Sequence, residues 1–323
     1  MNVLSLFDGI SCGRVALERA GVKVDKYFAS EIEKSAIKVS QSNWPDIIQV
    51  GDVCKVSFKD GVLHTEFGNY EVGQIDLLIA GSPCQGFSLA GKQLAFDDPR
   101  SKLYFEFERL LKEINPKWFF LENVRMKQEY KDTITSRLGV EHIAINSALV
   151  SAQNRYRLYW SNLAPHPPKD NGIVLADILE TNPDSKYNIT SGRLKWLENY
   201  GEVKQRDGYV AFNPTKAKCL TVRGEPSWNT TYIVQRPHGT NNGGLRAEDG
   251  KTPTLTTSSW EHNNILISQG LVRKLTPVEC ERLQTLPDGY TSAVSDNKRY
   301  AALGNCWTVD VVVSFFEQLK GME

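Results

Sequence analysis

The sequence predicts an α/β protein whose main domain is a parallel sheet with helices on both faces, joined to a smaller β-rich domain. Short apolar runs alternate with helical patterns through the first half of the chain, which is typical of such a sheet. Chemically capable side chains directly follow several of these runs, and ligands of such folds bind at the carboxyl ends of strands. After Ala164 the composition changes, and Pro165, Pro167 and Pro168 mark a boundary.

Strands and helices are expected in turn along the first half. The apolar runs that predict buried strands cover residues 3–7, 27–30, 75–80 and 118–121. Apolar residues at helical spacing predict helices through Val15 and Leu17, through Ala36 and Val39, and over residues 103–114. The carboxyl ends of the strands then meet at one edge of the sheet.

The second half contains a weak internal repeat of strand, polar loop with tryptophan, and strand. One copy covers residues 218–221, Trp228 and residues 232–234, and the other covers residues 254–256, Trp260 and residues 265–267. Two copies are too few for a solenoid, so we expect a separate β-rich domain. Helical patterning returns from Leu275. The predicted division is therefore 1–164, 165–270 and 271–323, with the last segment returning to the first domain.

Composition limits the class of protein. Hydrophobic residues make up 41% of the chain and charged residues 24%, as in a soluble globular protein. No run approaches the roughly 18 apolar residues that span a membrane, so a cytoplasmic location is expected. A net charge of +0 neither favours nor excludes nucleic acid. The six cysteines include no C-x-x-C pair, so no metal site is expected.

A glycine-containing loop, Phe7-Asp8-Gly9-Ile10-Ser11-Cys12-Gly13, follows the first predicted strand. Glycines at such a junction permit tight turns and close approach of the backbone to a ligand. Glu31 follows about 20 residues later, where a carboxylate can bind ribose hydroxyls. Asp52 follows the next element and is a candidate acceptor for an adenine amino group. The loop alone is equally typical of a plain helix start, but with these two acids it favours an adenosine-containing cofactor.

Two further strand ends carry candidate catalytic groups. Cys84, in Ser82-Pro83-Cys84-Gln85, is a candidate nucleophile, which requires nearby positive charge or helix-start amides to favour the thiolate. A buried structural cysteine is the alternative. Glu122 ends the strand at 118–121, where a carboxyl group of raised pKa can donate to a ring nitrogen or share its proton. A helix cap is the alternative, and taken alone it is the commoner role.

Two later motifs contribute candidate polar contacts. Arg155 and Arg157, in Gln153–Arg157, face the same side if this segment is a strand, and arginine pairs suit phosphate or carboxylate. A solvated strand face is the alternative. Asn305, in Gly304–Val309, is expected either to cap the last helix or to reach a cofactor at the first loop. The local pattern favours capping.

Taken together and in this order, the motifs resemble the cytosine carbon-5 DNA methyltransferase family of the short prophage and bacterial type. The matching segments are Phe7–Gly9, Pro83–Gln85, Glu122–Val124, Gln153–Arg157, residues 273–283 and Gly304–Asn305. They cover nearly the whole chain outside about 165–270, and the ordered set is far more specific than any one motif. Ser11-Cys12 stands where many bacterial members have two glycines, and the Asp8-Gly9-Ile10 form is more similar to eukaryotic de novo and short prophage-type enzymes.

The resemblance implies a Rossmann-like S-adenosylmethionine-dependent methyltransferase core with a target-recognition domain at 165–270. It implies that a flipped cytosine is attacked at ring carbon 6 by Cys84, with Glu122, Arg157 and Arg155 completing the catalytic set. The implied cofactor-binding residues are Phe7, Asp8, Gly9, Ile10, Gly13, Glu31, Ile32, Asp52, Val53, Pro83, Asn305 and Thr308. The implied DNA-binding residues are Gln85, Ser88, Arg223, Arg236, Asn241 and Arg246, with Gln85–Ser88 in a mobile loop over the flipped base.

Double-stranded DNA is the partner that the resemblance implies, and family members usually act as monomers. Three alternatives remain at this point. An RNA cytosine methyltransferase is disfavoured because the chain lacks the Cys-Phe-Thr of that branch. A catalytically silent DNA-binding protein is disfavoured because all four catalytic candidates are present. Transfer of a group other than methyl, from a modified S-adenosylmethionine, is left open, as are the recognised sequence, an accompanying restriction enzyme and a bacterial or phage source.

Overall fold

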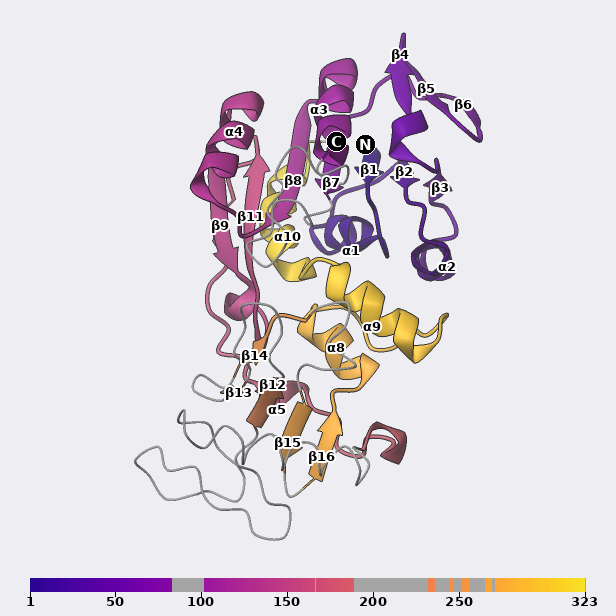
Figure 1. The fold of residues 1–323 in the computed structure, drawn as a ribbon. Helices are drawn as coiled ribbons and strands as arrows, with labels where there is room; N and C mark the ends of the chain where they lie inside the picture. The colour runs from indigo at the N-terminus through magenta and orange to yellow at the C-terminus, as the bar shows by residue number, and fades with distance from the viewer. Residues whose placement is uncertain are drawn as a thin grey trace.

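The computed structural model describes residues 1–82, 102–165, 167–188, 232–235, 244–246, 251–255, 265–268 and 271–322. Its centre is a seven-stranded sheet in the order β3-β2-β1-β7-β8-β11-β9 (Figure 1). These strands are β1 (Asn2–Leu6), β2 (Lys26–Ser30), β3 (Ile48–Gln49), β7 (Leu77–Gly81), β8 (Trp118–Val124), β9 (His142–Asn146) and β11 (Tyr156–Ser161). β11 is antiparallel to both neighbours, and the other adjacent pairs are parallel. The predicted α/β class is confirmed.

Alternate residues of the central strands contribute to two hydrophobic cores, one on each face of the sheet. In β7, Leu77 and Ile79 belong to one core, and Leu78 and Ala80 belong to the other. This follows from the strand period of two, which points successive side chains to opposite faces. The first core includes residues of α1 (Cys12–Arg19), α2 (Lys34–Asn43), α8 (Pro277–Leu283), α9 (Asp296–Asn305) and α10 (Val309–Phe316), and the second includes residues of α3 (Lys102–Ile114) and α4 (Gln128–Leu138).

The last helix packs against the centre of the sheet. The rings of Phe315 and Phe316 in α10 lie 5.1 and 5.4 Å from the ring of Phe120 in β8. The ring of Trp307 lies 5.3 Å from the same phenylalanine. The end of the chain therefore joins the core built by the first half, and this packing carries the Gly304–Asn305 motif to the sheet.

Three smaller sheets accompany the central one. β4 (Ser57–Lys59), β5 (Val62–Thr65) and β6 (Gly68–Glu71) form an antiparallel sheet that the sequence did not predict. β12 (Tyr232–Gln235), β13 (Gly244–Arg246), β15 (Ile265–Ser268) and β16 (Leu271–Lys274) form a second antiparallel sheet, in the order β13-β12-β15-β16. Figure 1 places this sheet at the opposite end of the view from β4–β6. β10 (Gln153–Asn154) pairs with β14 (Thr252–Pro253).

The predicted repeat is correct only in part. The expected strands at 232–234 and 265–267 are present as β12 and β15, whereas residues 218–221, Trp228 and Trp260 lie outside the described residues. The expected strand at 254–256 is wrong, because Thr254 and Leu255 lie beyond the end of β14. Thr254 Oγ1 instead donates to the carbonyl of Asn154, and the amide of Leu255 donates to Gln153 Oε1.

Two strand ends also differ from the prediction. β1 ends at Leu6, because Phe7 has a φ of 56° and turns the chain out of the sheet. β8 continues through Val124, because β7 pairs with it as far as Glu122 and β11 pairs with it to its last residue. Glu122 therefore lies inside a central strand, which excludes the helix-cap alternative.

The short remaining helices and turns are α5 (Leu175–Ile178), η1 (Val53–Lys55), η3 (Ser147–Leu149), η4 (Ser185–Tyr187) and η6 (Glu317–Leu319). Within the described ranges, no helix has the length and apolar character needed to cross a membrane.

Candidate active site

The carboxylate of Glu31 holds the loop between β1 and α1. Glu31 Oε2 accepts a hydrogen bond from the amide of Gly9 at 2.8 Å. Its Oε1 accepts from the amides of Ile32 and Glu33, each at 2.8 Å. Gly9 has a φ of 60°, in the left-handed region that glycine adopts without a steric cost. Three amide donors therefore orient this carboxylate at the carboxyl end of β2.

Asp8, in the same loop, takes part in a network of polar side chains. Its Oδ1 accepts from the hydroxyl of Tyr27 at 2.7 Å, and its Oδ2 accepts from Ser11 Oγ at 2.5 Å. Ser11 Oγ also lies 2.5 Å from Ser40 Oγ in α2. Burial raises the pKa of Asp8, although the hydrogen bonds from Ser11, Ser5 and Tyr27 oppose that rise. The network joins the loop to β2 and α2.

Asp52 is presented by a turn that Glu66 holds in place. Asp52 caps η1 by accepting a hydrogen bond from the amide of Cys54 at 3.0 Å. The amide of Asp52 donates to Glu66 Oε1 at 2.9 Å, and Lys55 Nζ donates to Glu66 Oε2 at 2.6 Å. Glu66 lies in the turn between β5 and β6, so the unpredicted small sheet supports one predicted cofactor residue.

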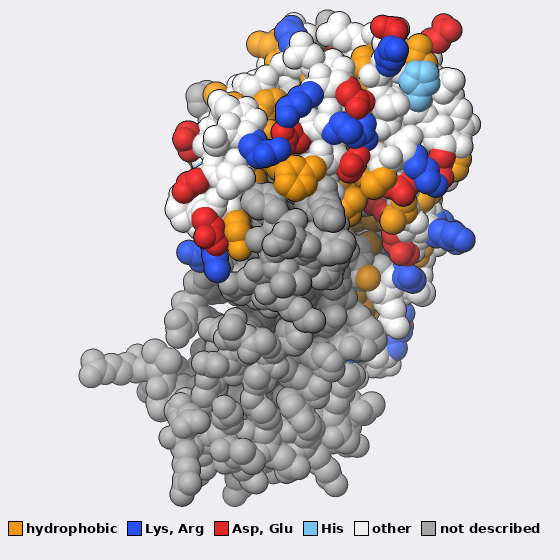
Figure 2. All heavy atoms as spheres, turned by 45° about the horizontal axis from the view of Figure 1, so that its top comes forward, with side chains coloured by type: hydrophobic (Ala, Val, Ile, Leu, Met, Phe, Trp, Pro, Cys, Tyr) orange, Lys and Arg blue, Asp and Glu red, His pale blue; other side chains and the backbone are white. Residues whose placement is uncertain are grey.

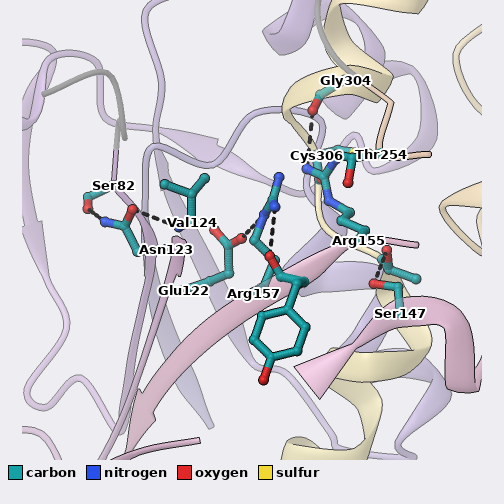
Figure 3. Close-up of polar contacts among 12 residues, drawn as sticks. Ser82, Glu122, Asn123, Val124, Ser147, Arg155, Arg157, Thr254, Gly304 and Cys306 are labelled. Carbon is teal, nitrogen blue, oxygen red and sulfur yellow. Dashed lines mark hydrogen bonds and ion pairs between the residues drawn. The ribbon is translucent and has the colours of Figure 1, made fainter. Parts of the chain in front are cut away.

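Glu122 and Arg157 form an ion pair across adjacent strands. Arg157 Nε lies 3.0 Å from Glu122 Oε1, and the two side chains are 14% and 11% exposed. Figure 3 shows the carboxylate and the guanidinium pointing toward each other between β8 and β11. Arg157 also donates from Nη1 to the carbonyl of Tyr156 at 2.9 Å. This arrangement excludes the solvated-face alternative for Arg157.

Asn123 ties β8 to the end of β7. Its Nδ2 donates to Ser82 Oγ at 2.9 Å, and its Oδ1 accepts from the amide of Val124 at 2.8 Å. Ser82 is the last described residue before the segment that carries Cys84. The contact therefore anchors the start of that segment beside Glu122 (Figure 3).

Arg155 is almost fully buried and binds backbone carbonyls. Its Nη1 donates to Leu255 at 3.0 Å, and its Nη2 donates to Gly304 at 3.1 Å and to Cys306 at 2.9 Å. Burial, followed by the nearby charge of Arg157, lowers the pKa of Arg155 to about 10. Arg155 therefore joins three segments that are distant in sequence, and it lies between β10 and β11 rather than within a strand.

Asn305 was expected to cap the last helix and Thr308 to contact the cofactor, but the structure places both differently. Asn305 is the last residue of α9, and Thr308 is the N-cap residue of α10, so the capping role predicted for Asn305 is wrong. Asn305 is exposed and lines the cavity described below. Thr308 is buried, where its Oγ1 donates to Gln284 Oε1 at 2.9 Å and accepts from Ser147 Oγ at 2.9 Å.

These elements surround one cavity of about 490 Å³, within the size range of small-molecule sites. Its lining includes Glu31 and Asp52 as well as Glu122, Arg155 and Arg157. Of the other predicted cofactor residues, it also includes Phe7, Asp8, Gly9, Ile10, Ile32, Val53 and Asn305. An apolar lining with a few fixed carboxylates and cations fits an adenosine-containing cofactor beside a second polar substrate.

Gly13 and Thr308 are not part of that lining. A Cβ on Gly13 would clash with the side chain of Ile79, so this glycine allows α1 to pack closely on β7. Gly13 and Thr308 therefore lie outside the cavity and contribute to the packing of the elements that line it.

Sequence reasoning missed several lining residues, among them Lys298 and Trp307. Lys298 Nζ lies 3.2 Å from Glu33 Oε1, which links α9 to the N-terminus of α2. It belongs to no motif, so the sequence carried no signal for it. A Cβ at Gly81 would lie 2.6 Å from Trp307 Nε1, so the glycine at the end of β7 makes room for the indole. The signal for Trp307 was its place two residues after Asn305 of the Gly304-Asn305 motif.

Several predicted site residues fall outside the described residues. They are Pro83, Cys84, Gln85, Ser88, Arg223, Arg236 and Asn241. Arg246 has its backbone in β13, but its side chain is not described. In the described part of the chain, no group of His, Cys, Asp and Glu side chains is arranged to hold a metal ion.

Comparison with known proteins identifies the family. The family model for C-5 cytosine-specific DNA methylases matches residues 1–321. Type II methyltransferase M.NlaX of Neisseria lactamica is 29% identical over 99% of this chain and 96% of that relative. Type II methyltransferase M1.ScrFI of Lactococcus lactis subsp. cremoris is 30% identical over 98% of this chain and 77% of that relative.

Solved structures agree on the fold. A putative DNA modification methyltransferase encoded within an E. coli prophage has a TM-score of 0.67 at 22% identity, covering 99% of this chain and 98% of that one. The Dnmt2 methyltransferase of S. pombe has a TM-score of 0.59 at 18% identity, covering 100% of this chain and 99% of that one.

The chain belongs to the C-5 cytosine-specific DNA methylases. It is a methyltransferase that uses S-adenosylmethionine to methylate carbon 5 of cytosine in DNA, and its fold is the Rossmann-like core of such enzymes. The family, the reaction and the cofactor predicted by the ordered motifs are confirmed.

Proposed function

We propose that the cavity binds S-adenosylmethionine at its Glu31–Asp52 end and the target cytosine at its Glu122–Arg157 end. The observation that carries this proposal is that both pairs line the same cavity. Glu31 would bind the ribose hydroxyls and Asp52 the adenine amino group. Phe7, Ile10, Ile32 and Val53 would supply apolar contacts to the adenosine, while Asp8, Gly9, Pro83 and Asn305 would contact the rest of the cofactor.

The chemistry proposed for the chain's own residues begins at Cys84. Its sulfur bonds to ring carbon 6, and the electron pair moves to carbon 5, which takes the methyl group. A water molecule then takes the carbon-5 proton, and the electron pair of that bond expels Cys84 as a thiolate, which restores the aromatic ring. S-adenosylmethionine, when bound, supplies an electrophilic methyl group on its sulfonium. Glu122 would give a proton to ring nitrogen 3, where electron density gathers as Cys84 attacks, and would take it back as Cys84 leaves.

Arg157 and Arg155 would have different roles. Arg157 holds the Glu122 carboxylate through a contact of 3.0 Å and lines the cavity, so it is placed to contact the cytosine. Arg155 uses its guanidinium on three carbonyls, one of which belongs to Gly304 beside Asn305. We therefore propose Arg157 as a catalytic residue and Arg155 as a positioning residue.

The DNA would be double-stranded, bound by a monomer, with its target base flipped because a stacked cytosine is out of reach. We propose domains at 1–164, 165–270 and 271–323, with 165–270 recognising the target. Gln85 and Ser88 would close over the base, and Arg223, Arg236, Asn241 and Arg246 would contact bases or phosphates. Bacterial and phage relatives support a cytoplasmic location in a bacterial or phage-infected cell.

Whole-plasmid bisulfite sequencing, after expression in a host that lacks cytosine methylation, tests the proposal. Wild type is expected to protect cytosines in one short sequence context. Cys84→Ser and Glu122→Gln are expected to lose this protection but to bind S-adenosylmethionine normally by calorimetry. Glu31→Ala is expected to weaken cofactor binding itself. Wild-type protection by Glu122→Gln would contradict the placement of cytosine at that residue.

A further inference from the structure

Arg125 is an exposed arginine next to the active-site cavity. It directly follows Val124, which lines the cavity at the end of β8. Its guanidinium carbon lies 5.3 Å from the ring centroid of Tyr156, the first residue of β11. Tyr156 is 43% exposed, which is unusual for a large aromatic residue of a central strand. A cation and an aromatic ring are therefore presented together at the rim of the site.

Arg125 differs in its partners from the other arginines whose side chains the structure describes. Among the arginines whose side chains the structure describes, it alone has neither a carboxylate nor a backbone carbonyl as a partner. The contrast is clear on α3, where Arg109 pairs with Glu106 and Glu113. Figure 2 shows basic side chains interspersed with acidic ones on the described part of the face that it draws. Arg125 is thus a cation left available to an anionic ligand.

The pair is coupled to the catalytic strands. In the register of β8 and β11, Val124 lies opposite Arg157. Tyr156, the first residue of β11, and Arg125, directly after the end of β8, each lie one residue further out. The carbonyl of Tyr156 accepts from Arg157 Nη1 at 2.9 Å, and Arg157 in turn contacts Glu122. Because successive side chains of a strand point to opposite faces, the Tyr156 ring and the Arg125 guanidinium over it lie on the other face of the sheet from Glu122 and Arg157. They lie at the strand ends that border the proposed position of the target base.

We propose that Arg125 and Tyr156 form a DNA-binding pair, in which Arg125 binds a backbone phosphate beside the target cytosine and Tyr156 packs on the adjoining nucleotide. This inference rests on the proposed placement of the cytosine at Glu122. Arginine binds phosphate through paired donors, and aromatic rings stack on bases that lose a neighbour when the target leaves the helix. Holding the guanidinium over the ring before binding reduces the entropy lost when DNA arrives.

The test measures DNA affinity as a function of salt, using a fluorescein-labelled duplex that carries the sequence identified by plasmid sequencing. For Arg125→Gln, the slope of log affinity against log salt is expected to fall in magnitude by about 0.9, the value for one phosphate contact. Tyr156→Ala is expected to bind about tenfold more weakly, and Tyr156→Phe, which keeps the ring, is expected to bind as wild type does. Cofactor affinity is expected to stay unchanged in all three.

Arg137→Gln is the matched control. It removes the same charge from another cation–π pair, in which Arg137 lies 5.1 Å from the ring centroid of Phe105. In this variant Glu108, the acidic partner of Arg137, still pairs with Lys112, whose Nζ lies 2.5 Å from Glu108 Oε1. The substitution therefore does not leave the Glu108 carboxylate unpaired. The salt slope of this control is expected to equal that of wild type.

If Arg125→Gln bound DNA with the same affinity and the same salt slope as wild type, the inference would be overturned, whether or not the variant methylates its site normally. Lost activity with unchanged affinity and slope would also overturn it, because the pair would then act on the chemical step. Failure of the proposed function is a separate result, in which wild type protects no cytosine in a plasmid. In that case the slopes of wild type and Arg125→Gln on plasmid DNA still decide whether Arg125 contacts DNA.

Discussion

Replacing the two arginines of the Gln153–Arg157 motif one at a time is expected to separate stability from catalysis. Arg155→Met leaves three buried carbonyls, at 2.9 to 3.1 Å from the present guanidinium, without a donor. Hydrogen bonds to a charged group contribute about 1.5–3 kcal/mol each, and because such bonds are not additive we expect a total loss of about 3–5 kcal/mol. Arg157→Met loses one partly exposed ion pair, for which about 1 kcal/mol is appropriate.

The assays are thermal unfolding and steady-state methylation. Arg155→Met is expected to lower Tm by roughly 5–10 °C, and Arg157→Met by only about 2 °C. Turnover at saturating DNA is expected to fall about a hundredfold in Arg157→Met, because a charge beside the reacting ring is lost. Arg155→Lys keeps the charge, but a single ammonium cannot reproduce the planar fork that reaches three carbonyls, so it is expected to resemble Arg155→Met.

The opposite pattern would refute this reasoning. If Arg155→Met melted as wild type does and lost as much turnover as Arg157→Met, its bonds to the carbonyls would contribute little to stability. Arg155 would then act directly on the substrate, as the sequence motif alone suggests.

Three further changes have expected outcomes. Glu66→Gln weakens the support for the Asp52 amide and is expected to raise the Kd for S-adenosylmethionine about fivefold by calorimetry. Burial raises the pKa of Asp8 above its ordinary 3.8, so the wild-type protein gains stability as the pH falls through the titration of this carboxyl group. Asp8→Asn is therefore expected to be more stable than wild type at neutral pH and to lose that advantage below pH 3.8. Urea unfolding at a series of pH values measures this difference. Glu279→Ala breaks a buried bidentate pair with Arg273, at 2.6 and 2.7 Å, and is expected to cost about 3–5 kcal/mol of unfolding free energy in urea.

Each of these three has its own control. Glu71→Gln, on the exposed face of the same small sheet as Glu66, is expected to leave cofactor affinity unchanged, and an equal loss in both variants would remove the special role of Glu66. If the difference in unfolding free energy between wild type and Asp8→Asn were the same at every pH, the pKa of Asp8 would not differ between the folded and unfolded states. A double variant, Arg273→Met with Glu279→Leu, is expected to recover much of the loss; no recovery would assign the cost to something other than an unpaired buried charge.

The structure brings predicted site residues together where their placement depends on a strand end. Glu31 and Asp52 follow parallel strands, and Glu122 lies two residues before the end of β8. The geometry of a parallel sheet brings such ends together whatever the details of packing. The apolar runs also located the central strands to within a few residues, because strands buried on both faces require continuous apolar sequence.

Contacts between distant segments could not be predicted in this way. Asn305 was expected to cap a helix, yet α9 extends to include it. The small sheet β4–β6 escaped prediction because its short strands are half exposed and carry no continuous apolar run. Arg125 and Tyr156 gave no signal, because their pairing depends on which strands become neighbours.

The sequence by itself determined the fold class, the family and several of the groups that line the cavity, because ordered motifs and strand patterns are local properties. Only the tertiary structure decided which partners the two arginines of one motif contact. In sequence they are equivalent, two residues apart with the same charge. In the folded chain Arg155 lies where three carbonyls from distant segments converge, whereas Arg157 lies opposite a carboxylate, and partners of this kind are set by long-range packing.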